Sequence, residues 1–284
     1  MEENFKGNHE LEPLDIFAVF NNYLLLFFGF SCILSNVFIQ QLFVMMGETR
    51  AGTVVGPLLG VVVPVYLVTH RFPAGFRKQI LIRRPQALLA AQILIATLLV
   101  VVIVDYIYVL SAKFTTAPTE YVEGLKELKP SGGPAIVLTF LGLCILVPLA
   151  EEIVFRGLVQ RVFTRNMGGA LAIFLAGAFF GVIHLQPQML LSMIAFGVFL
   201  GYLFYATSNL TYPILAHCAF NTVSYVQLVM LPVEKLDSVP PYTRSPWALL
   251  VATAATAYLL LRIKKGGSVS AKPPHDVSGD SDAR

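Results

Sequence analysis

Eight apolar windows of about 20 residues follow one another along this chain, and they constrain its fold more than any other feature. A helix of about 20 apolar residues crosses the roughly 30 Å hydrocarbon core of a bilayer. Only 13% of the residues are charged, about half the fraction found in soluble domains. The sequence therefore predicts an all-α, polytopic bundle of transmembrane helices. The predicted spans are 17–45, 53–69, 87–110, 134–155, 168–186, 188–207, 212–231 and 246–263.

Two of these boundaries are ambiguous in the sequence. The first window is over-long and contains Asn21, Asn22 and Asn36, so it tilts or begins as an interfacial segment. The fifth and sixth windows are separated only by Gln186, Pro187 and Gln188, and a count of seven spans is the alternative.

The chain divides into four parts by composition. N-terminal helices and an outer loop occupy 1–133, a polar-containing core 134–231, a last transmembrane helix 232–265 and a tail 266–284. The loop 111–133 predicts a short surface helix, and the composition of the tail is that of a disordered segment.

The distribution of Lys and Arg predicts the orientation. With both termini inside, 14 of the 20 basic residues lie in inner segments and 6 in outer ones. The positive-inside rule therefore places both termini in the cytoplasm. No secretory signal is evident, since residues 1–15 carry five acidic side chains against one Lys. The short loops favour a prokaryotic plasma membrane, and a net charge of +3 is too small to indicate a nucleic-acid partner.

Cysteines and peripheral histidines predict no site. Cys32, Cys144 and Cys218 lie far apart in apolar runs, which indicates packing residues and no disulfide or zinc spacing. His9, His70 and His275 lie in the tails or at a helix end and are expected at the surface.

The stretch Pro148–Arg165 places ionisable side chains directly after an apolar run. Such groups are costly at membrane depth, about 2.5–3.5 kcal/mol each, and mark function by default. In a helix, Glu152 and Arg156 stand at i,i+4 in the favourable order for an ion pair, whereas Glu151 lies about 100° round the axis. We therefore expect Glu152 to be structural and Glu151 to be free for chemistry.

Three further polar residues lie in the following apolar runs. His184 follows FFGVI, and His217 and Asn221 are four residues apart on one helix face. A lone intramembrane histidine usually bridges helices, but this group together with the glutamates suits a buried hydrolytic site. A transport or proton pathway is the alternative.

Amide hydrolysis needs an activated water and a group that stabilises the oxyanion. Glu151 in a low-dielectric site suits general-base work, His184 could hold the same water, and His217 with Asn221 could donate to the oxyanion. No serine lies in a G-x-S-x-G setting, and no cysteine adjoins a histidine, so a covalent nucleophile is less favoured. Two histidines and a glutamate also match the ligand count of a hydrolytic zinc site, although not the H-E-x-x-H spacing.

Three motifs carry a family resemblance: E-E-x-x-x-R, F-x-x-x-H and H-x-x-x-N, in that order. They resemble those of the CAAX protease and bacteriocin-processing family, which includes the intramembrane CAAX prenyl endopeptidases, over about residues 134–231. The motif residues are Glu151, Glu152, Arg156, Phe180, His184, His217 and Asn221.

The resemblance implies an eight-helix bundle around a cavity and a metal-free, glutamate-type endopeptidase. It implies that Glu151 and His184 activate water, that Glu152 and Arg156 order the site, and that His217 and Asn221 form the oxyanion hole. The implied partners are membrane lipid and a membrane-anchored protein or peptide. Zinc is the alternative cofactor. The alternative function is that of a non-catalytic immunity or scaffold protein. Because His184 is predicted near the outer end of its helix, it meets Glu151 only if the fourth helix continues past Arg156 or the fifth past Gln186.

Overall fold

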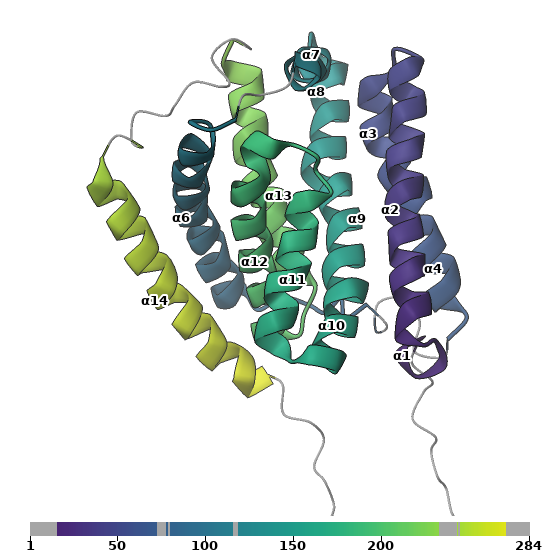
Figure 1. Ribbon diagram of the computed structural model, residues 1–284, viewed down its shortest axis with the longest axis vertical. Coiled ribbons are helices and arrows are strands. Elements are labelled where there is room, and N and C mark those ends of the chain that lie inside the picture. The colour runs from purple at the N-terminus through teal and green to yellow at the C-terminus, as the bar shows by residue number, and fades with distance from the viewer. Residues whose placement is uncertain are drawn as a thin grey trace, which may run out of the picture.

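The protein is an all-helical bundle in the computed structural model, as the apolar windows predict (Figure 1). The structure describes residues 16–72, 78, 80–115, 119–232, 243 and 245–270, and no strand occurs among them. His9, His275 and the tail beyond residue 270 lie outside this described part.

The first predicted window is two helices. After the short α1 (Ile16–Val19), the helix is interrupted at residues 20–21. Asn21 caps α2 (Asn22–Met45) by accepting a hydrogen bond from the backbone N–H of Leu24 at 2.8 Å. The polar side chain that made this window ambiguous therefore satisfies a free N–H at the start of the helix.

A second span runs back along α2 without a break. It consists of α3 (Thr49–Pro57), the π-helical turn η1 (Leu58–Val62) and α4 (Val63–His70). The long helix α6 (Ala87–Ser111) follows, and the predicted surface helix of the outer loop is α7 (Thr119–Leu128).

The helix that carries the glutamates is longer than its apolar window. It continues without interruption through α8 (Gly133–Phe140), η2 (Leu141–Leu146), α9 (Val147–Val154), η3 (Phe155–Val159) and α10 (Gln160–Met167). The predicted end at residue 155 is thus too early. Arg156 and Gln160 are buried and have polar partners, so these side chains do not end the helix.

Proline explains two of the three π-helical turns. Pro148 and Pro64 lack a backbone N–H, and a proline ring crowds the carbonyl four residues earlier, here Cys144 and Gly60. Those carbonyls lie within η2 and η1, where the wider turn relieves the crowding. The third turn, η3, contains no proline and begins three residues after Glu152.

Four helices complete the bundle. Gly168, with φ of +82°, turns the chain from α10 into α11 (Gly169–Val182), which ends four residues before its predicted boundary. The short η4 (Pro187–Met189) leads into α12 (Leu190–Thr207), followed by α13 (Thr211–Met230) and α14 (Pro246–Ser270). The described part of α14 thus includes residues 266–270, which the sequence assigned to the tail.

Six helices in the described part of the chain are long and apolar enough to cross a membrane. The two other predicted spans correspond to α11, which is apolar but 14 residues long, and to α13, which contains His217 and Asn221. The protein is therefore an integral membrane protein, and the prediction of about eight membrane helices is consistent with its fold. The six are Asn22–Met45, Thr49–His70, Ala87–Ser111, Gly133–Met167, Pro187–Thr207 and Pro246–Lys265.

The arrangement of the helices positions the polar residues in the interior. The helix α8–α10 lies between the α2–α4 pair and the group α11–α13, while α14 packs on the outside against α6 and α12 (Figure 1). The start of α1 and the end of α14 lie at the same end of the bundle, as the distribution of basic residues predicts.

Candidate active site

Glu152 and Arg156 form a fully buried ion pair. Both side chains are 0% exposed, and Arg156 Nη1 donates to Glu152 Oε1 at 2.8 Å. Desolvating two charges costs several kcal/mol each unless further hydrogen bonds satisfy them. Those further bonds come from neighbouring helices and bring α12 and α13 to this pair.

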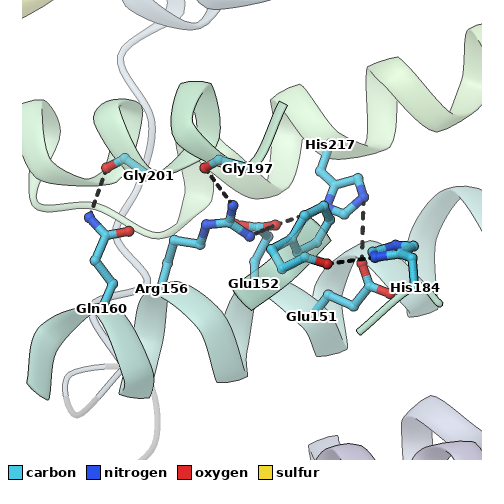
Figure 2. Close-up of polar contacts among 9 residues, drawn as sticks. Glu151, Glu152, Arg156, Gln160, His184, Gly197, Gly201 and His217 are labelled. Carbon is cyan, nitrogen blue, oxygen red and sulfur yellow. Dashed lines mark hydrogen bonds and ion pairs between the residues drawn. The ribbon is translucent and has the colours of Figure 1, made fainter. Parts of the chain in front are cut away.

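Arg156 is also held by α12 and by aromatic rings. Its Nη2 donates to the carbonyl of Gly197 at 2.8 Å, and its guanidinium carbon lies 4.9 Å from the ring centroid of Phe180. A planar cation over an aromatic face is electrostatically favourable. The guanidinium therefore has one orientation, with one amine toward the carboxylate and the other toward α12 (Figure 2).

His217 on α13 lies between the two glutamates. Its Nδ1 is 2.8 Å from Glu152 Oε1, and its Nε2 is 3.7 Å from Glu151 Oε2 (Figure 2). Phe196 and Phe180 pack edge-on against the imidazole, with centroids at 5.3 and 5.7 Å. The ring is thus fixed by packing and by Glu152, and its other nitrogen points toward Glu151.

Glu151 is the less enclosed carboxylate. Its side chain is 19% exposed, and its carboxylate points toward the rings of His217 and His184 (Figure 2). The expected difference between the adjacent glutamates is therefore present in their geometry: one is occupied by an ion pair and the other is open.

His184 reaches this site from the turn after α11. Its Nδ1 lies 2.7 Å from the carbonyl of Phe180, and its ring packs on the Phe180 ring at 4.7 Å. The expected condition for its meeting Glu151 is fulfilled because the fourth helix continues past Arg156 to Met167. α11 itself ends at Val182, so the fifth helix does not continue past Gln186.

The hydrogen bonds of the two histidines define which nitrogen carries the proton. A carbonyl and an ionised carboxylate only accept, so Nδ1 is the N–H donor in both rings. In the neutral form, Nε2 of each ring then carries a lone pair. Both histidines can therefore accept a proton or a water hydrogen at Nε2, and His217 can donate to an oxyanion only as an imidazolium.

Asn221 lies one turn beyond His217 on α13. Its Nδ2 donates to the carbonyl of Leu143 in η2 at 2.8 Å. An amide NH₂ group has two hydrogens, so one donor is occupied by this bond and one remains.

No metal site forms among the described residues: no group of three or more His, Cys, Asp or Glu side chains is placed to hold an ion. The three cysteines are free thiols, of which Cys32 and Cys144 are buried, and His70 stacks on Tyr66 at the end of α4.

Three residues that hold this site were not identified from the sequence. Gln160, four residues after Arg156, is buried and donates to the carbonyl of Gly201 at 2.9 Å, parallel to the contact of Arg156 with Gly197 (Figure 2). Two signals could have indicated them: the i,i+4 spacing of Arg156 and Gln160, and the G-x-x-x-G pattern at Gly197 and Gly201, which permits close helix approach.

Comparison with known families agrees with the resemblance of the three motifs. Residues 133–223 match the family model described as type II CAAX prenyl endopeptidase Rce1-like. This segment is similar to the Rce1-like family. It runs from the start of α8 into α13 and contains all six candidate residues. The family's description is that of an endopeptidase, which supports peptidase activity in general. Comparison with curated proteins and with solved structures found no match.

Proposed function

We propose that the protein is an intramembrane endopeptidase that hydrolyses a peptide bond near the C-terminus of a membrane-anchored protein or peptide. The observation that carries this proposal is the unequal pair of glutamates. Glu152 is occupied by Arg156 and His217, whereas the carboxylate of Glu151 is open and lies 3.7 Å from His217 Nε2. The similarity of residues 133–223 to the Rce1-like family supports a substrate of the CAAX type.

In the proposed mechanism, Glu151 is the general base. A water held between its carboxylate and His184 Nε2 loses a proton to Glu151 as the water oxygen attacks the scissile carbonyl. The proton then passes to the leaving amine. Because the site is enclosed by helices and has a low dielectric, the charge that develops is stabilised more strongly than in water.

Four residues stabilise and orient this reaction. Glu152 and Arg156 hold the His217 ring with Nε2 toward Glu151. Asn221 donates its remaining amide hydrogen to the oxyanion, and His217 shares in this role when it is protonated. Membrane lipid surrounds the bundle, and we assign the protein to a prokaryotic plasma membrane on its size and short loops.

The test is peptide cleavage by purified protein in proteoliposomes. Prenylated CAAX peptides and matched unprenylated peptides are offered, and products are identified by mass spectrometry. We expect a new C-terminus near the prenylated cysteine and no cleavage by the Glu151→Gln variant. Absence of cleavage by the wild-type protein with every peptide, at a melting temperature equal to that of the variant, favours an immunity or scaffold role.

A second arm tests the metal-free reaction. We expect exhaustive chelation to leave the rate unchanged. Stoichiometric zinc in active protein, with activity lost to chelator and restored by zinc, contradicts the glutamate-only mechanism.

A further inference from the structure

Two glycine carbonyls on α12 accept hydrogen bonds from two side chains of the glutamate-bearing helix. Arg156 Nη2 donates to Gly197 at 2.8 Å, and Gln160 Nε2 donates to Gly201 at 2.9 Å. Donors and acceptors both advance by four residues in the same direction, and the two contacts lie side by side in Figure 2. They form a ladder with two rungs between these helices.

The ladder depends on glycine at both acceptor positions. A Cβ on Gly201 would lie 2.9 Å from Gln160 Oε1, and a Cβ on Gly197 would lie 2.9 Å from Gly177 Cα on α11. A side chain at either position would need space that a neighbouring helix already occupies. Because glycine has no side chain, Arg156 and Gln160 can reach the backbone carbonyls of α12.

Gln160 has no direct part in the proposed reaction. It lies eight residues after Glu152, is 1% exposed, and makes one side-chain hydrogen bond, since its Oε1 has no partner. Burying an amide costs free energy that a methionine of similar length does not. Packing alone therefore does not account for a glutamine here, but a directional bond to Gly201 does.

We propose that Gln160 is a positioning residue that sets the axial register of α12 against the helix of the glutamates. With this register, the Gly197 carbonyl meets Arg156, Arg156 holds Glu152, and Glu152 orients His217 toward Glu151. A slip of one residue moves a helix by about 1.5 Å along its axis, which separates the partners of a 2.8 Å bond. This role rests on the proposed function, because the rate is its final readout.

The matched variants are Gln160→Met and Gln188→Met. Gln188 is also 1% exposed, but neither of its side-chain polar atoms has a hydrogen-bond partner, so its replacement removes no bond. For Gln160→Met we expect kcat to fall by about 10- to 100-fold with KM within about two-fold, as for a small misplacement of catalytic groups. For Gln188→Met we expect an unchanged kcat.

Gly201→Ala tests the other side of the same bond. It leaves the Gln160 side chain present and displaces it, so we expect a similar loss of kcat. If the bond is the shared cause, the double variant Gln160→Met/Gly201→Ala loses no more than either single variant. Additive losses contradict the proposal.

A spin-label distance tests the register without an activity assay. Thr164 and Tyr205 are each four residues beyond Gln160 and Gly201, so labels at these two sites, in protein with its three cysteines replaced by alanine, continue the ladder. We expect the distance distribution to shift or broaden in Gln160→Met and in Gly201→Ala but not in Gln188→Met.

The outcomes separate the two proposals. If the wild-type protein cleaves no peptide, the proposed function fails, and the spin-label distances still test the positioning role. An unchanged distance together with an unchanged kcat in Gln160→Met overturns the positioning role. The positioning role is also overturned if the loss of activity equals the fraction of protein that is unfolded at the assay temperature and the spin-label distance in folded protein is unchanged.

Discussion

The adjacent glutamates Glu151 and Glu152 differ in hydrogen bonding and burial because they face different neighbouring residues. Glu152 Oε1 accepts hydrogen bonds from Arg156 and His217, and the side chain is fully buried. Glu151, one residue earlier, points to the side that His184 and His217 share (Figure 2). A rotation of about 100° per residue is enough to separate an ion-paired carboxylate from an open one.

Replacement of Glu151 by glutamine tests this difference. We expect Glu151→Gln to lower kcat by about 10²–10⁴-fold, the contribution typical of a general base, because the amide cannot take a proton from water. The melting temperature in detergent should stay near that of the wild-type protein, since the buried ion pair of Glu152 and Arg156 is retained. Cleavage at the wild-type rate would exclude Glu151 as the base.

Replacement of Glu152, unlike that of Glu151, should lower stability as well as activity. Glu152→Ala leaves Arg156 charged and unpaired at membrane depth, and breaking a buried pair costs about 3–5 kcal/mol. We expect a lower free energy of unfolding, measured by denaturant titration in detergent, together with lower activity. An unfolding midpoint equal to that of the wild-type protein would contradict the structural role of the pair.

At the scale of helices, α11 and α12 meet through glycine. A Cβ on Gly177 would lie 2.7 Å from the backbone nitrogen of Val198, and a Cβ on Gly181 would lie 2.6 Å from Ile194 Cγ1. Both helices carry a G-x-x-x-G pattern, which in membranes lets backbones approach and pack closely. The close approach places the Gly197 carbonyl where Arg156 reaches it.

Alanine at Gly177 should therefore separate this helix pair. We expect Gly177→Ala to destabilise the protein by roughly 1–3 kcal/mol, the usual cost of overpacking, and to lower activity. Gly124→Ala on α7 is the control: its Cβ would meet nothing within 4 Å, and alanine has the higher helix propensity. Unfolding in detergent measures both, and equal midpoints for the two variants would show that the α11–α12 contact tolerates a methyl group.

For the whole molecule, the ends of the helices define two faces. Arg84 precedes the start of α6 and Lys113 follows its end, so the two positions lie on opposite sides of the membrane. The end of α14, which carries Lys264, lies at the same end of the bundle as the start of α6 (Figure 1). From the excess of basic residues at this end, we predict that it is the cytoplasmic face.

Cysteine labelling in intact cells tests this topology. We expect Lys113→Cys to react with a membrane-impermeant maleimide, and Arg84→Cys and Lys264→Cys to react only after permeabilisation. All three positions are exposed, and the native thiols give little background because Cys32 and Cys144 are buried and Cys218 is half-buried. Labelling of Arg84→Cys before permeabilisation would reverse the orientation, and equal labelling of Arg84→Cys and Lys113→Cys would contradict the span.

The amino-acid sequence by itself determined the helical class, the approximate spans and the ion pair. Apolar windows of membrane length favour helices, because a helix satisfies every backbone N–H and C=O group in lipid by hydrogen bonds within the segment. The i,i+4 spacing of Glu152 and Arg156 is likewise a local property of one helix. Both features depend on residues that are close in the chain.

The tertiary structure decided which contacts form between segments that are far apart in the chain. The window 134–155 ended too early because hydropathy counts Arg156 and Gln160 as polar, whereas the fold pairs them with Glu152 and with α12 carbonyls. The placement of His217 against Glu152 joins residues 65 positions apart, and the ladder joins residues 41 positions apart. Backbone carbonyls of glycine leave no side-chain signal, so only the packing of α12 on the glutamate helix shows that they complete the site.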